Sequence, residues 1–297
     1  MLIEESISCS EGSKCKMDQI KEKCLKILLE IDYVCNKAGL KYYLYAGSLL
    51  GAIRHEGFIP WDDDIDIVMM REDYEKFPKA CEQYLNCQRF ELQTIDSDLY
   101  ASNPWMKLHD KNTAFISGIR RQGAMEGINI DIFPLDNVPD SKRRMKVRAF
   151  FVDKLNFIYQ YRFQEHSKQA SIKMKLFQSL IIVIPPWDEM RFKKLYDKYI
   201  QKYNDRKTEN VVYLSNRNYL RKVISRRCFD ETVMLPFENS YFPAPSGWDD
   251  ILVGLYGKNY MQLPPEDQRV TVHGTVVIDL EHSWKTYKRG TSGYEKV

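Results

Sequence analysis

Apolar residues near the beginning of the chain recur three or four positions apart, which is the spacing of one helix face. The stripe consists of Ile20, Cys24, Ile27, Leu28, Ile31, Val34 and Cys35. It predicts an amphipathic helix over 17–37, ended by Gly39. The apolar and aromatic residues 40–45 predict a short strand, and 49–55 predict a short second helix that stops before Gly57.

Further along, short alternating runs separated by turn residues are typical of strands. The predicted strands are 64–70, 89–95, 105–109, 113–116 and 127–133. We expect the third and fourth to form a hairpin, and Pro134 to end the fifth because proline cannot donate to a ladder. A helix is predicted over 71–85, with a kink at Pro78. The expected fold class is α/β, in its α+β form: a small mixed sheet with flanking helices.

Helical patterns then dominate the middle of the chain. Three helices are predicted, over 145–158, 172–184 and 189–203. The last third is rich in proline, glycine and short apolar runs, typical of loops and short strands. We therefore expect a core in 1–140, a helical segment in 141–209, and a loop-rich C-terminal part in 210–297 that packs on the core.

Charge is spread unevenly over the 297 residues, although the net charge is only +3. Between Ser141 and Lys207 there are 17 Lys and Arg against six Asp and Glu, so the remainder is acidic. The excess indicates an anionic partner for 142–207, with an anionic membrane surface or a polyanionic glycan as the expected kind. The solvated side of amphipathic helices is the alternative explanation. No nucleic acid is expected, because no binding motif accompanies the charge.

The cysteines and the apolar runs indicate the cellular compartment in which the protein is expected. Seven cysteines, an odd number without a C-x-x-C pair, argue against a zinc site or a disulfide framework and favour reduced thiols. The first fifteen residues lack the apolar core of a signal peptide. The longest apolar run, 180–184, is far shorter than the ~18 residues of a membrane span. We expect a cytoplasmic protein, with peripheral contact at the inner face of the membrane as the association that its basic segment would support.

Acidic residues are concentrated where a strand is predicted to begin, in the segment WDDDIDI that starts at Trp61. Asp64 and Asp66 are two apart, so on a strand both carboxylates point to one face. Such carboxylates repel each other and are costly to bury without a cation. Asp131, flanked by isoleucines on a later strand, is expected to complete a site for Mg²⁺, with Mn²⁺ as the alternative. Asp62 is a candidate general base or outer ligand.

Groups suited to phosphate stand close by in the sequence. Gly47 lets the backbone approach an anion, and Ser48 adds a hydroxyl at the beginning of the predicted helix. Arg54 and His55, one or two turns later, and Lys107 are candidates to balance phosphate charge. A Gly-Ser turn, a D-x-D pair and a distant aspartate together indicate metal-assisted transfer of a phosphate-bearing group.

Each candidate also has a plainer explanation. The run 62–66 would otherwise be a solvated acidic turn, and Asp131 a brace for the turn before Pro134. Arg54 would pair with a neighbouring acid, His55 would cap its helix, and Lys107 would be a surface lysine. The alternation with isoleucines, and the Gly-Ser block just before the acids, favour the metal site over these alternatives.

The block GSLLGAIRHEGFIPWDDDID, from Gly47 to Asp66, resembles the signature of the LicD family. The segment IDIFPLD at 130–136 is similar to the family's second block, and 256–265, followed by His273, to its tail. That family includes bacterial phosphocholine transferases, and its wider group includes the fukutin-like ribitol-phosphate transferases. The resemblance touches most of the chain but is dense only over 43–77, and the basic middle segment is its least similar part.

The resemblance implies a nucleotidyltransferase-like fold in the catalytic core, with the metal on Asp64, Asp66 and Asp131. It also implies transfer of a phosphorylated alcohol, most often from CDP-choline, to a hydroxyl of a glycan or glycolipid acceptor such as a lipopolysaccharide or teichoic acid precursor, with release of CMP. Choline, ethanolamine, ribitol and glycerol stay open as the alcohol. Two alternatives remain: a nucleotidyltransferase that moves NMP from NTP to a small molecule or protein, and a non-catalytic scaffold that binds glycan or membrane.

Overall fold

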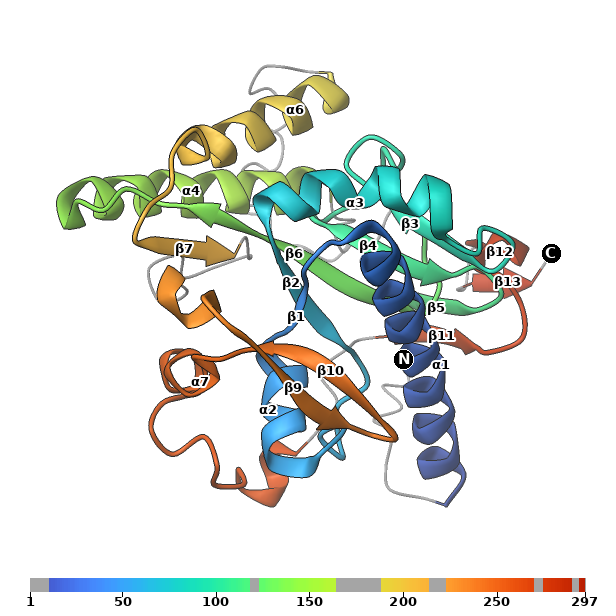
Figure 1. The fold of residues 1–297 in the computed structure, drawn as a ribbon. Helices are drawn as coiled ribbons and strands as arrows, with labels where there is room; N and C mark the ends of the chain where they lie inside the picture. Colours follow the sequence, from blue (N-terminus) through green and yellow to red (C-terminus); the bar gives the residue numbers. More distant parts are fainter. Residues whose placement is uncertain are drawn as a thin grey trace.

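A mixed sheet runs through the centre of the protein, with helices packed around it (Figure 1). The computed structural model describes residues 11–117, 123–163, 188–213, 223–269, 275–289 and 294–296. The predicted α+β class is confirmed: helices and strands are mixed along the chain, and most strand pairs are antiparallel.

Strands from distant parts of the chain lie side by side in the central sheet. Its order is β1-β2-β6-β4-β3, with β7 also paired to β6 and β8 paired to β7. The bounds are β1 Tyr43–Leu44, β2 Asp66–Met70, β3 Phe90–Gln93, β4 Met106–Asp110, β6 Asn129–Asn137, β7 Asn210–Tyr213 and β8 Val223–Ser225. Among the described strands, β2 and β6 form the parallel pair, and every other pairing in this sheet is antiparallel.

Two strand predictions are wrong, for related reasons. The expected hairpin does not form: β4 pairs with β3 and β6, while β5 (Ala114–Ser117) pairs with β11 (Thr275–Asp279) from the far end of the chain. Nor does β6 stop before Pro134. On one side of β6 the partner changes from β4, which pairs up to Ile132, to β7, which pairs from Leu135. Pro134 lies in this gap, so its missing N–H leaves no partner unsatisfied.

The helices of the N-terminal half follow the predicted stripes closely. They are α1 (Glu11–Ala38), α2 (Ala46–His55) and α3 (Arg71–Tyr84). The seven residues of the α1 stripe are all at most 2% exposed, and full burial of each such side chain is worth about 1.5–3 kcal/mol. α2 begins three residues earlier than expected, at the Gly-Ser turn itself, and α3 continues through Pro78.

The basic middle segment forms a helical layer with a small core of its own. It contains α4 (Lys142–Phe163), α6 (Glu189–Ile200) and the 3₁₀ turn η1 (Gln201–Tyr203), which confirms the first and third predicted helices. The second, 172–184, lies outside the described residues. The core is built from Val152, Tyr159 and Phe163 of α4 against Phe192 and Tyr196 of α6. A buried ion pair between Arg71 and Asp136 lies beneath it, where α3 meets β6.

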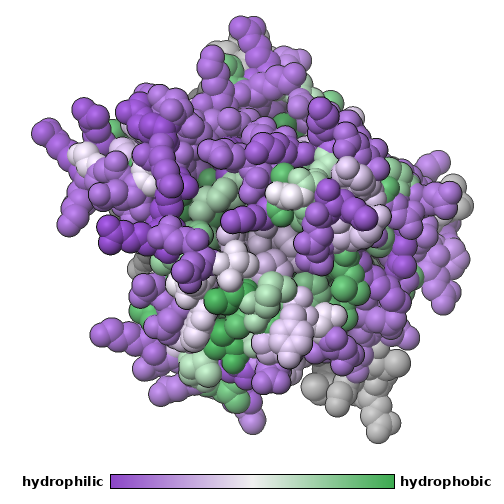
Figure 2. All heavy atoms as spheres, in the orientation of Figure 1, coloured by the Kyte–Doolittle hydropathy of each residue, from purple (hydrophilic) through white to green (hydrophobic). Residues whose placement is uncertain are grey.

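The C-terminal part returns to the sheet and to α2. The hairpin of β9 (Thr232–Phe237) and β10 (Ser240–Pro245) contacts β1 and α2, and α7 (Trp248–Tyr256) also contacts α2. The remaining short elements are η3 Arg226–Phe229, η4 Glu266–Gln268, η5 Trp284–Thr286, β12 Tyr287–Arg289 and β13 Tyr294–Lys296. In the view of Figure 2, hydrophobic side chains gather over the β9–β10 hairpin, whereas those over α4 and α6 are mainly hydrophilic. Within the described ranges, no helix has the length and apolarity to cross a bilayer.

Candidate active site

Four residues form one row across the sheet: one from each of three strands, and Tyr45, which directly follows β1. Asp66 of β2 lies opposite Asp131 of β6, and Asp131 lies opposite Lys107 of β4. On the other side of β2, the N–H of Tyr45 donates to the carbonyl of Asp66 at 3.0 Å, which continues the antiparallel register of β1. Residues opposite each other on paired strands point to the same face. The two predicted acids and the predicted lysine are therefore brought together, and we call these four residues the acid row.

Asp131 is held by two side chains of the β4 strand region. Lys107 makes an ion pair with Oδ1, and the indole N–H of Trp105 donates to Oδ2 at 3.1 Å. Lys107 is 5% exposed and also donates to Oδ1 of Asn129 at 3.1 Å. Lys107 is thus a buried counter-ion of Asp131, and together with Trp105 it fixes that carboxylate in place.

The surroundings of Asp66 disfavour its ionised form. Burial raises the pKa of Asp66 well above its ordinary value, and the negative charges of Asp64, Asp131 and Asp62 raise it further, while Lys107 opposes them. The three other aspartates therefore each lie close enough to Asp66 to act on its charge. A positive charge at this place would relieve their repulsion.

The position of Asp64 differs from the prediction. β2 begins at Asp66, so Asp64 lies in the segment just before the strand. The extended pairing reaches back only to Ile65, whose carbonyl accepts from the N–H of Asp131 at 3.2 Å. Two residues earlier, the chain contacts α1 instead: the Sγ of Cys24 donates to the carbonyl of Asp63 at 3.6 Å. Asp64 therefore approaches the row from the loop rather than as the strand neighbour of Asp66.

Ser48 is built into the backbone around the acid row. Its Oγ accepts the backbone N–H of Asp66 at 2.9 Å, and its side chain is buried. The first turn of α2 is therefore fastened to the beginning of β2. The hydroxyl hydrogen of Ser48 still has to be donated elsewhere.

Gly47 is required by a close approach of Asp62. A Cβ on Gly47 would lie 2.7 Å from Oδ2 of Asp62, inside any normal contact. The Asp62 carboxylate thus lies against the first turn of α2, where the helix dipole favours negative charge. Ala46, just before it, has a φ of +45°, an uncommon conformation for a residue with a Cβ. The predicted glycine and acid are brought together, in direct contact.

Arg54 and His55 lie at the other end of α2 and face different partners. Arg54 donates from Nη1 to the carbonyls of Tyr260 and Gln262 at 2.9 and 3.3 Å, which joins α2 to the C-terminal loop. The His55 ring is 6.3 Å from that of Trp61, and burial together with the charge of Arg54 lowers the pKa of His55. The guanidinium of Arg269 lies 5.5 Å from the Trp61 ring. These contacts place the pair beside Trp61 and the C-terminal loop rather than in the acid row.

Sequence reasoning missed three aromatic residues near the acids. Trp105 bonds Asp131, and Tyr45 stands next to Asp66 in the acid row. Among the described residues, the buried hydroxyl of Tyr45 has no hydrogen-bond partner. Tyr256, at the end of α7, has a pKa raised by burial and by the charges of Asp66 and the neighbouring acids. Trp105 could have been found from its two-residue spacing to Lys107, which predicts a shared strand face. Nothing local marks the two tyrosines.

The donor set of the acids can be compared with what a divalent cation requires. Carboxylate oxygens are the ligands of Mg²⁺, which commonly takes only one or two from the protein and completes its shell with phosphate and water. Asp66 and Asp131, adjacent in register and next to the charge of Asp64, fit that requirement. In the described part of the chain, no group of three or more His, Cys, Asp and Glu side chains is placed so that it could hold a metal ion. The residues therefore suit a cation shared with a phosphate-bearing substrate.

Comparison with known proteins shows which family the part of the chain around the acid row resembles. Residues 39–181 match the family described as LicD/FKTN/FKRP, nucleotidyltransferase domain. The matched region contains every predicted site residue, from Gly47 to Asp131.

The individual relatives agree with the family match. The lipopolysaccharide cholinephosphotransferase LicD of Haemophilus influenzae is 28% identical over 263 residues, which cover 84% of this chain and 93% of that protein. Ribitol 5-phosphate transferase FKRP of Homo sapiens is 46% identical over 54 residues, which cover 17% of this chain and 11% of that protein. The first similarity extends over most of both chains, whereas the second is short and dense. The resemblance to the LicD family is thereby confirmed.

Proposed function

We propose that the protein is a metal-dependent phosphotransferase that moves a phosphorylated alcohol from a CDP-activated donor to a hydroxyl of a cell-surface glycan or glycolipid precursor. The observation that carries this proposal is the register of Asp66 and Asp131 on adjacent parallel strands, inside a LicD family domain. The names of its relatives, a cholinephosphotransferase and a ribitol 5-phosphate transferase, support transfer of a phosphorylated alcohol. Phosphocholine from CDP-choline is the leading candidate, because the more extensive similarity is to the former.

In this proposal each residue of the site has a distinct task. Asp64, Asp66 and Asp131 would hold Mg²⁺ or Mn²⁺, which when bound neutralises charge on the donor phosphates. Lys107 and Trp105 hold the Asp131 carboxylate in its orientation. Gly47 and Ser48 form the turn against which the phosphates lie.

The transfer itself needs a base and a leaving group. The acceptor hydroxyl oxygen attacks the phosphorus that bears the alcohol, and the bond from that phosphorus to the bridging oxygen breaks. The electron pair leaves with CMP, and the hydroxyl proton passes to a carboxylate. Asp62 is our candidate for this base, because it is half-buried and lies between the Gly47 turn and the acid row. Arg54 and His55 would act at the outer edge, on the leaving nucleotide.

The proposal is tested by CMP release over a panel of CDP-alcohols and acceptors with Mg²⁺. The panel should contain the choline, ethanolamine, ribitol and glycerol donors. Asp66→Asn and Asp131→Asn should abolish release while the protein stays folded, whereas Asp205→Asn, in an exposed pair with Arg206, should not change it. Full activity of either site variant, or undiminished release after exhaustive chelation, would reject the proposal.

The same assay separates the two alternatives. Labelled CTP and labelled CDP-choline are supplied in separate reactions. Nucleotide retained on a product indicates a nucleotidyltransferase, and released CMP indicates the phosphotransferase. A folded wild-type protein that releases no CMP with any donor, but binds glycan or membrane, indicates a scaffold.

A further inference from the structure

Helix α4 carries two stripes, and only one of them is buried. Ala149, Val152, Asn156 and Tyr159, spaced three and four apart, face the sheet and α6. The opposite side carries a second stripe with the same spacing, which is exposed. It contains Arg143, Val147, Phe150 and Lys154, and Phe151 lies beside Phe150. Since an amphipathic helix normally turns its apolar side chains towards the core, exposed apolar side chains on this second side need a separate explanation.

The exposed stripe combines large apolar side chains with cations. Val147 is 55% exposed, Phe150 60% and Phe151 51%. The Phe150 and Phe151 rings pack edge to face at 5.6 Å, and the ammonium of Lys154 lies 5.8 Å from the Phe150 ring. Such exposed aromatics are costly in water and are kept where they meet a partner.

The surrounding surface is strongly cationic. Lys142, Arg143, Arg144 and Lys146 are all exposed on the first turns of α4, and Asp153 is the single acid in the helix. Cations flanking exposed aromatics on one helix are typical of segments that lie in the plane of an anionic membrane surface. At 22 residues α4 is about 33 Å long, so its stripe can extend along such a surface.

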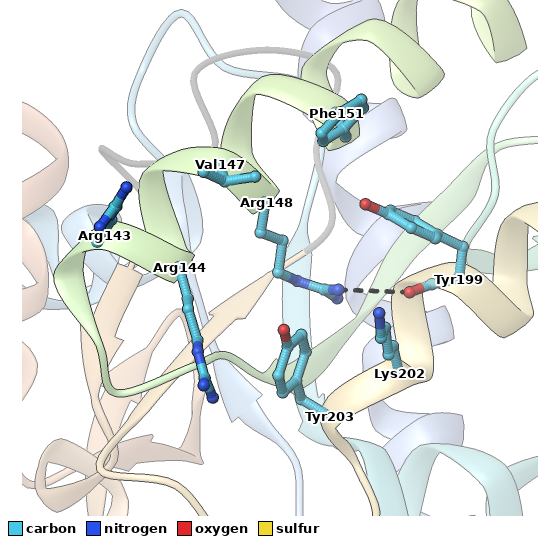
Figure 3. A pocket seen from close by; sticks show the side chains of 8 residues that line it. All are labelled: Arg143, Arg144, Val147, Arg148, Phe151, Tyr199, Lys202 and Tyr203. Carbon is cyan, nitrogen blue, oxygen red and sulfur yellow. Dashed lines mark hydrogen bonds between the residues drawn. The ribbon is translucent and has the colours of Figure 1, made fainter.

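A groove beside the stripe adds a place for a headgroup. It lies between α4 and the α6–η1 segment, has a volume of about 490 Å³, and is lined by Arg144, Arg148, Lys202 and Tyr203 among others (Figure 3). Arg148 forms its inner wall, donating to the carbonyl of Ile200 at 2.5 Å and lying 4.8 Å from the Tyr203 ring. Arg144 and Lys202 stand exposed at its edges. Arg148 is therefore held in place by its contacts, whereas Arg144 and Lys202 are exposed and can contact a phosphate.

We propose that this α4 surface, namely the exposed stripe and the adjoining groove, binds an anionic bilayer. Phe150 and Phe151 enter the interfacial region, while Arg143, Arg144 and Lys202 contact lipid phosphates. A soluble polyanion would form ion pairs with the cations but would not bury the exposed phenylalanines. The combination of cations and exposed aromatic side chains therefore favours a bilayer. This binding is independent of the transfer reaction proposed above, since it uses no residue of the acid row.

The test is sedimentation of the whole chain with vesicles of phosphatidylglycerol and phosphatidylcholine, compared with vesicles of phosphatidylcholine alone. We expect binding to the anionic vesicles that weakens as salt rises. Phe150→Ser/Phe151→Ser and Arg143→Gln/Arg144→Gln should each weaken it about ten-fold or more. Tyr241→Ser, which removes an aromatic that is 66% exposed on β10, and Lys37→Gln, which removes an exposed lysine of α1, should not.

Three results would overturn the proposal. One is a failure of the wild type to sediment with anionic vesicles. Another is unchanged binding by both α4 variants. The third is binding that the phenylalanine variant retains in full and that a soluble phosphate polymer competes away, since that marks a polyanion site. Thermal melting of each variant confirms that it is folded, and no outcome depends on CMP release.

Discussion

The acid row and the α4 surface are both strongly charged, yet their charges are held in different ways. In the acid row, the charged side chains come from three different strands, and Asp131 is fixed by Trp105 and Lys107. On α4, exposed cations follow one another along a single helix. Partly buried charges in fixed positions interact strongly with one another, whereas exposed charges are screened by water and salt. Substitutions should therefore have all-or-none effects in the first region and graded effects in the second.

The largest expected effect is on Asp66. Asp66→Asn should lower CMP release by about 10³-fold or more, because it removes a metal ligand. It should not lower the free energy of unfolding at neutral pH, since the charge it removes is one that burial and neighbouring acids disfavour. Measuring activity and thermal melting together checks both parts. A strong loss of stability would show that Asp66 supports the fold instead.

The pH dependence of stability gives a second measurement on the same residue. A folded-state pKa above the unfolded value means that the contribution of Asp66 is fully present below the ordinary pKa of aspartate and is lost as pH rises towards the raised value. In metal-free protein, wild type should lose stability over that interval relative to Asp66→Asn. Added Mg²⁺ should reduce the difference. Parallel stability curves for the two proteins would contradict the raised pKa.

A somewhat smaller effect is expected for Lys107. Lys107→Met leaves the Asp131 carboxylate without its ion pair and should cost about 1–3 kcal/mol of stability. CMP release should fall about 10- to 100-fold, because Asp131 is no longer held in place. The double variant Lys107→Met/Asp131→Asn should recover most of the stability but no activity. Equal stability losses in the single and double variants would mean that the pair is not coupled.

Gly47→Ala distinguishes positioning from folding. The new Cβ would meet Oδ2 of Asp62, the end of a side chain that can rotate away. We expect a loss of stability below about 1 kcal/mol and a fall in CMP release of about ten-fold, since the candidate base is displaced. Gly254→Ala is the matched control in α7, where a Cβ meets nothing within 4 Å and φ is not positive. It should be neutral or slightly stabilising.

The smallest effect is expected for a single cation of α4. Arg143→Gln alone should weaken binding to anionic vesicles by about five-fold and leave CMP release from soluble substrates unchanged. Titrating vesicles at several salt concentrations checks this, because the difference from wild type should shrink as salt rises. A complete loss of binding from this one change would indicate a specific pocket and contradict the graded behaviour of the α4 surface.

Much of the fold and part of the site could be predicted because they depend on local spacing. The α1 stripe is buried as its period requires, and β2 and β6 formed where alternating runs of apolar residues were seen. The D-x-D pair and the Gly-Ser turn were recognised from their order along the chain. The hairpin around Asn112 was predicted from an equally good local signal, yet β5 found its partner in β11. Turn residues predict that the chain reverses its direction. They do not predict which strands will pair with the two strands that flank the turn.

By itself, the sequence determined which residues have the chemistry for the proposed reaction and which faces of its helices are apolar, because both follow from residue type and period. Only the tertiary structure decided that Lys107 pairs with Asp131, that Arg54 binds the C-terminal loop, and that Asp64 approaches from outside the strand. The same holds for α4, whose two stripes look alike in the sequence although only one is buried. Each of these depends on which distant segment lies alongside, and that choice is made by the packing of the whole sheet and its helices.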